Sequence, residues 1–114
     1  MDDIIADAAA LGKKIASHPK MKDFIAAVDA LKADKDAESL LQRYQEKARE
    51  IDVKASQGRP VEVDEKREVA ELQKQVASND RIKAMLRAET DYLDMMRRIN
   101  QAIDRAAAEA HGVS

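Results

Sequence analysis

The chain of 114 residues contains no cysteine and no tryptophan, and it has only three aromatic residues, three glycines and two prolines. Without cysteine there can be no disulfides, no thiolate metal ligands and no cysteine nucleophile. Packing and electrostatics must therefore hold the fold together, and a reducing cytoplasm suits such a chain. We expect a cytoplasmic protein.

Long apolar runs and targeting signals are also missing. The N-terminus, MDDIIADAAALGKKIA, carries acidic residues where a secretory signal peptide needs basic ones. No apolar stretch approaches the roughly 18 residues of a membrane-spanning helix. We expect no membrane partner.

An excess of one charge is lacking as well. Twenty basic and 22 acidic residues give a net charge of −2, and each half of the chain carries 10 basic and 11 acidic groups. Nucleic acids and anionic membranes both select clustered lysine and arginine. The charge pattern therefore disfavours nucleic-acid binding.

The residues that are abundant favour helices, because alanine, leucine, lysine, arginine, glutamate and glutamine lose little side-chain freedom in a helix. Apolar residues at helical spacing predict a first helix over residues 2 to about 16, ended by Ser17, His18 and Pro19. A second helix follows Pro19. Asp34 is a candidate N-cap for a third helix, although a continuous bend from the second is also open.

The same spacing predicts two long helices. Residues 36–57 keep apolar side chains on one seam until Gly58 and Pro60 stop the helix. Asp64 is the expected N-cap of a short helix that ends near Ser78, and residues 81–110 form the longest helix. The predicted fold is all-α, a single domain over residues 1–114 with four to five helices arranged as an elongated antiparallel hairpin or bundle.

The long helices predict self-association. About 30 residues make a rod of about 45 Å, longer than the diameter of about 34 Å expected for a compact chain of this size. If 36–57 and 81–110 pair antiparallel, part of each apolar seam stays uncovered unless a second subunit covers it. We expect a homo-oligomer, most simply a dimer. The expected interface residues are Leu41, Tyr44, Ile51, Tyr92, Met96, Ile99 and Ile103.

A second partner is suggested by the breadth of the apolar surface on the last helix. Met95 and Leu93 lie beside the line formed by Met96 and Ile99 rather than on it. Such a widened face suits a helix that contacts two neighbours.

No group of residues points to catalysis or to a cofactor. The two histidines, His18 and His111, lie at a helix junction and in the C-terminal tail, and no glutamate is followed by histidine three residues later. The serines lie at or near helix ends, where we expect their hydroxyls to cap backbone amides. The glycines are isolated, so they form no phosphate-binding loop. We expect a non-enzymatic protein without a metal or cofactor.

One alternative function comes from the most basic part of the sequence. Five side chains could hold RNA phosphates beside a nuclease: Arg81, Lys83, Arg87, Arg97 and Arg98. Acidic residues are interleaved with them, which reduces the net field. An RNA-binding accessory protein of a ribonuclease complex is therefore the alternative to an adaptor.

The order of these features resembles the YlbF/YmcA family of small bacterial helical proteins. The segments that carry the resemblance are LGKKIASHPKMKDF, AVDALKADKDAESLLQRYQEK, SQGRPV, SNDRIKAMLRAETDYL and MMRRINQAI. The resemblance implies an oligomerising all-α hairpin bundle and a regulatory role in competence, sporulation and biofilm formation. It also implies complexes with other regulatory proteins and an influence on messenger RNA maturation.

The family has also been linked to iron–sulfur clusters. This chain departs from that pattern because it has no cysteine to ligate iron as thiolate. We therefore expect no cluster here, and the resemblance implies no catalytic residue.

Overall fold

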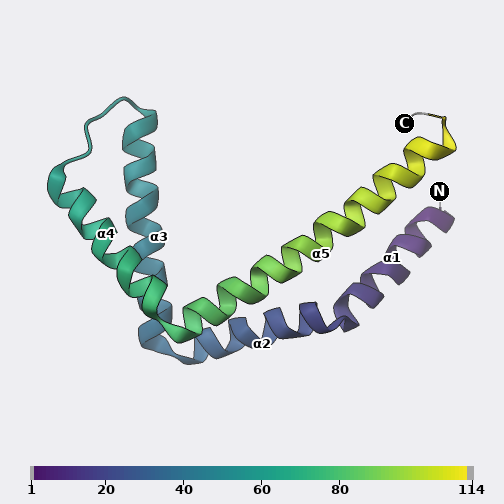
Figure 1. The fold of residues 1–114 in the computed structure, drawn as a ribbon, viewed down its shortest axis with the longest axis horizontal. Helices are drawn as coiled ribbons and strands as arrows, with labels where there is room; N and C mark the ends of the chain where they lie inside the picture. Colours follow the sequence, from purple (N-terminus) through teal and green to yellow (C-terminus); the bar gives the residue numbers. More distant parts are fainter. Residues whose placement is uncertain (1, 113–114) are drawn as a thin grey trace. The chain divides into compact units, whose positions relative to one another are not determined.

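The computed structural model describes residues 2–112, and the elements within that range are all α-helices. They are α1 (Asp2–Ser17), α2 (Pro19–Ala33), α3 (Lys35–Ser56), α4 (Val63–Ser78) and α5 (Asp80–Ala110) (Figure 1). The predicted all-α class is confirmed. The helices expected over 36–57 and 81–110 each begin one residue earlier than predicted.

Local chemistry explains most of the helix boundaries. Asp34 has an extended backbone and its Oδ1 accepts a hydrogen bond from the Ala37 amide at 3.1 Å, so α2 and α3 are separate helices. Gly58 takes the left-handed conformation with φ +69° just after α3. That conformation and Pro60 stop the helix where the sequence predicted.

Two expectations about helix ends were wrong. The N-cap position of α4 is Glu62, which makes no side-chain capping bond, and Asp64 lies inside the first turn. There its carboxylate still suits the positive end of the helix dipole. The hydroxyls of Ser17, Ser56 and Ser78 donate to carbonyls in the last helical turn instead of accepting from amides.

The chain divides into two compact units. One, unit 1, comprises the residues up to Ala26 together with those from Arg87 onward, and the other, unit 2, comprises Ala27–Leu86. Unit 1 therefore holds α1, the first half of α2 and most of α5. Unit 2 holds the end of α2, all of α3 and α4, and the first turns of α5.

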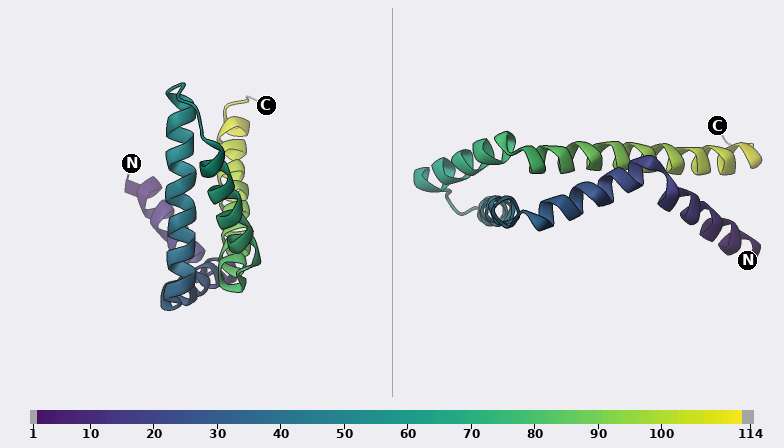
Figure 2. Two further views of the ribbon diagram at one scale, coloured as in Figure 1. Left: turned by 90° about the vertical axis from the view of Figure 1, so that its left-hand side faces the viewer. Right: turned by 90° about the horizontal axis from the view of Figure 1, so that it is seen from below.

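Unit 2 is built on an antiparallel hairpin of α3 and α4, visible in Figures 1 and 2. The segment 57–62 that joins them is short, and short connections make consecutive helices neighbours. We expected α3 to pair with the 81–110 helix; the partner of α3 within unit 2 is α4. The buried side chains of unit 2 come from α2, α3, α4 and α5: Leu31, Ala37, Leu40, Leu72, Val76, Ile82 and Met85.

Unit 1 has much less interior. Phe24 of α2 stacks on Tyr92 of α5 with ring centroids 5.2 Å apart and an interplanar angle of 23°, a favourable aromatic arrangement. Met95 is buried, whereas α1 contributes no buried side chain. One of the three helices of unit 1 therefore contributes only exposed or half-buried side chains.

Candidate protein interaction surface

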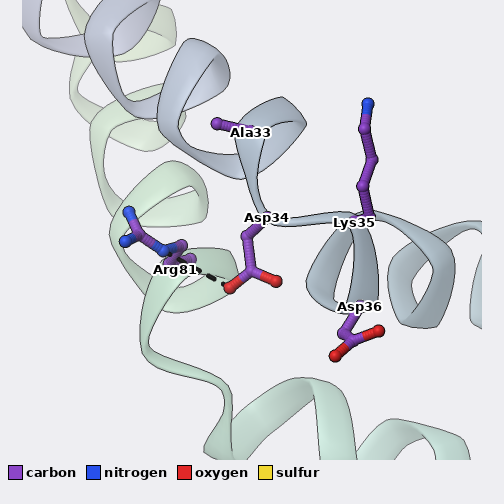
Figure 3. A pocket seen from close by; sticks show the side chains of 5 residues that line it. All are labelled: Ala33, Asp34, Lys35, Asp36 and Arg81. Atoms are coloured by element: carbon purple, nitrogen blue, oxygen red, sulfur yellow. Dashed lines mark ion pairs between the residues drawn. The ribbon is translucent and has the colours of Figure 1, made fainter.

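Unit 2 supplies a rigid base for any surface that α3 presents. Asp34 caps α3 through Oδ1, while its Oδ2 lies 3.4 Å from Nε of Arg81 in the first turn of α5 (Figure 3). Asn79 caps α5 in the same way, because its Oδ1 accepts from the Ile82 amide at 3.0 Å. Since Ile82 is fully buried, the starts of α3 and α5 are tied to each other and to the core.

Ion pairs hold the α3–α4 hairpin in register. Nζ of Lys54 lies 2.5 Å from Oε1 of Glu65, and Nζ of Lys47 lies 3.3 Å from Oε2 of Glu68. The Lys54 ammonium lowers the pKa of Glu65 by hydrogen bonding to the carboxylate. A hydrogen bond to Glu68 in turn raises the pKa of Lys47. Both shifts favour the charged form of the side chain, so Glu65 stays a carboxylate and Lys47 an ammonium, and each is paired across the two helices.

The predicted interface residues fall into two sets. Leu41, Tyr44 and Ile51 lie on α3 in unit 2, and all three are half-buried. Leu41 lies about 100° around the helix from the buried Leu40, so it sits at the margin of the hairpin core. The structure places this set on one helix without making it part of the closed interior.

The second set lies along α5 in unit 1. Tyr92, Met96 and Ile99 are half-buried, and Ile103 is 50% exposed. Tyr92 has its aromatic partner in Phe24, whereas the exposure of the seam increases toward the C-terminal end. Ile103 is therefore the member of this set that offers a partner the most accessible aliphatic side chain.

One part of the accessible surface was not predicted from the sequence: Ile4 and Ile5 in the first turns of α1 are 68% and 61% exposed. Leu93, which the sequence placed on the widened apolar face of the last helix, is 55% exposed. Ile4 is one of the apolar residues at helical spacing that predict the first helix. The signal that could have revealed its exposure is Ile5, because two adjacent isoleucines cannot both face one neighbouring helix.

The basic residues proposed for RNA are mostly paired with acids. Arg97 and Arg98 both bind Asp94, Arg98 with its Nε 3.0 Å from Oδ2, and the hydrogen bond from Arg97 lowers the pKa of Asp94. Arg81 pairs with Asp34, and Lys83 lies 3.8 Å from Asp80. These carboxylates reduce the positive field available to a phosphate backbone.

Groups of histidine, cysteine, aspartate or glutamate that could hold a metal ion do not occur within residues 2–112. A membrane crossing would require a longer and more apolar helix than any found in that same range. The features that stand out are therefore the apolar helix faces.

Comparison with known proteins supports a regulatory family. Residues 4–107 match the family model described as control of competence regulator ComK, YlbF/YmcA. A UPF0342 protein from Limosilactobacillus fermentum is 38% identical over 77 residues, which cover 68% of this chain and 64% of that protein. The chain thus spans just under two thirds of that relative.

A solved structure shares the fold. A chain in the crystal structure of Bacillus subtilis RicA in complex with RicF superposes with a TM-score of 0.79 at 17% identity, covering 95% of this chain and 96% of the other. Because the family model spans nearly the whole sequence, this chain belongs to the YlbF/YmcA family of regulators.

Proposed function

We propose that the protein is a non-catalytic cytoplasmic adaptor that associates through its helix faces, with a second copy of itself and with another regulatory protein. The observation that carries the proposal is the uncovered apolar surface of unit 1. No side chain of α1 is buried, and large aliphatic groups on α1 and α5 remain in water. Removal of apolar surface from water is favourable by about 25 cal/mol per Å², which acts against the entropic cost of association.

Two further facts support protein partners over a substrate or RNA. The solved structural relative is described as RicA in complex with RicF, which makes a second regulatory protein a reasonable partner here. In addition, at least four of the five basic residues considered for RNA already pair with carboxylates.

We propose that the interface uses the half-buried and exposed positions of both long helices. On α3 these are Leu41, Tyr44 and Ile51; on α5 they are Tyr92, Met96, Ile99 and Ile103. Ile99 offers the sharpest test, because it is half-buried within the chain and lies between two other members of the α5 set.

Ile99→Asp should weaken self-association by at least about tenfold in the dissociation constant, since a charge without a partner would enter an apolar contact. Gln101→Asp is the matched control, because Gln101 is exposed, lies on the same helix and points about 200° away. Sedimentation velocity over a concentration series measures both variants, and circular dichroism verifies that they remain helical.

Equal weakening by the two aspartates would show that charge alone disturbs association and would contradict an interface at Ile99. RNA binding whose affinity falls steeply with added salt would favour the alternative accessory function, because only phosphate contacts release counterions in that way. Apolar association should survive or strengthen in salt.

A further inference from the structure

The tip of the α3–α4 hairpin carries a shallow groove with an unusual balance of side chains. Its lining residues are Arg49, Glu50, Val53, Lys54 and Arg59. Val53 is 42% exposed at the groove, which leaves an aliphatic floor in water. The groove residues belong to the last turns of α3 and to the segment 57–62 that leads to α4.

The charges around this floor are only partly neutralised within the hairpin. Lys54 forms an ion pair with Glu65, and Oε2 of Glu50 lies 3.5 Å from Nζ of Lys47. Neither Arg49 nor Arg59 has an ion pair or side-chain hydrogen bond with another residue in the range 2–112. The groove therefore presents two arginines beside an apolar surface, which suits an acidic segment with an aliphatic side chain.

The start of α1 has that complementary character. Asp2 and Asp3 lie in its first turn, and the adjoining Ile4 and Ile5 are 68% and 61% exposed. Its first basic residue is Lys13, so more than two turns are purely acidic and apolar. The N-terminal turn of α1 therefore offers carboxylates to the two arginines and aliphatic side chains to Val53.

We infer that the first turn of α1 from one copy docks on the Arg49–Val53–Arg59 groove of another copy. An isoleucine of α1 covers Val53, and Asp2 and Asp3 face the two arginines. This inference rests on the proposed self-association and adds to it a contact that the α3 and α5 seams do not contain.

The absence of cysteine from the chain permits a direct test by disulfide trapping. A chain with Ile5→Cys is mixed with a chain carrying Val53→Cys under mild oxidation, so that a mixed disulfide can form only between different molecules. Ile5→Cys mixed with Ser39→Cys is the matched control, since Ser39 is also exposed on α3. All three sites are exposed, so the substitutions leave the core intact.

We expect the Ile5–Val53 adduct to form at least about tenfold faster than the Ile5–Ser39 adduct. Arg49→Glu with Arg59→Glu in the Val53→Cys chain should remove that advantage, because like charges then face each other. Asp2→Lys with Asp3→Lys in the other chain should restore it.

Equal rates for the two adducts would overturn the docking contact, and so would an advantage that is insensitive to both charge reversals. Light scattering on the unmodified protein separates this failure from that of the proposed function. An assembly larger than one chain without the specific adduct contradicts only the α1 contact, whereas a monomer contradicts both.

Discussion

At the residue scale, a few polar side chains stabilise the starts of helices, a role that composition alone does not predict. Asp34 caps α3 and pairs with Arg81, and Asn79 caps α5 above the fully buried Ile82. A cap is worth about 1 kcal/mol, which is a large share of the stability of a small domain. These residues serve the architecture, and the function that we propose falls to apolar groups instead.

Glu65 should make the stability of the α3–α4 hairpin depend on pH. Its pKa is lowered from the ordinary value of 4.5, chiefly by the hydrogen bond from Lys54. A lowered folded-state pKa adds stability at pH values above that of the unfolded group, and the contribution is lost as the pH falls through the folded-state value. The ion pair should therefore stabilise the hairpin at neutral pH and fail in acid.

Urea unfolding of the wild type and of Glu65→Gln checks this. The wild type should have the larger free energy of unfolding at about pH 6, and its difference from Glu65→Gln should shrink progressively below about pH 4.5. Glu109→Gln, an exposed position on α5, should show no comparable change. A Glu65→Gln difference that stays constant across this range would contradict the role of the Lys54 pair.

At the element scale, helix boundaries were predictable because they depend on local chemistry. Asp34, Gly58 and Pro19 each fix a boundary through capping or backbone geometry within a few residues. Which helices pack together was not predictable in the same way. α3 and the 81–110 helix both carry apolar seams. Periodicity predicts that another helix covers each seam, but it does not predict which helix does so.

Two glycines offer a matched pair of opposite substitutions. Gly58 has φ +69°, so Gly58→Ala should destabilise the hairpin by about 1 kcal/mol through backbone strain alone, since an added Cβ meets no atom within 4 Å. Gly12→Ala should stabilise α1 by about 0.5–1 kcal/mol, because Gly12 is mid-helix and its Cβ also meets open space.

Circular dichroism during thermal unfolding measures both changes. The melting temperature should fall for Gly58→Ala and rise for Gly12→Ala. A Gly58→Ala variant as stable as the wild type would contradict the left-handed C-terminal geometry of α3.

At the scale of the whole molecule, the proposed interface is divided between the two units. Its seven residues are half-buried or exposed, three on α3 and four on α5, and their role at an interface stays a prediction. The exposed start of α1 was not predicted. The exposure of an apolar residue depends on tertiary packing, which the helical spacing of residues in α1 does not determine.

We propose that the chain is one domain, because α2 and α5 each continue unbroken from one unit into the other. Unfolding either unit would then fray helices that the other unit shares. We propose that the small interior of unit 1 makes the chain depend on association, since that is where aliphatic side chains remain in water.

The most direct measurement of this account is the mass of the unmodified protein in solution, by light scattering across the micromolar range. One chain weighs 12.7 kDa. The account predicts a mass of at least twice that value, most simply that of a dimer, which falls toward a single chain only on strong dilution. A constant mass of 12.7 kDa at every concentration would contradict it, because the apolar faces of α1 and α5 would then be stable in water.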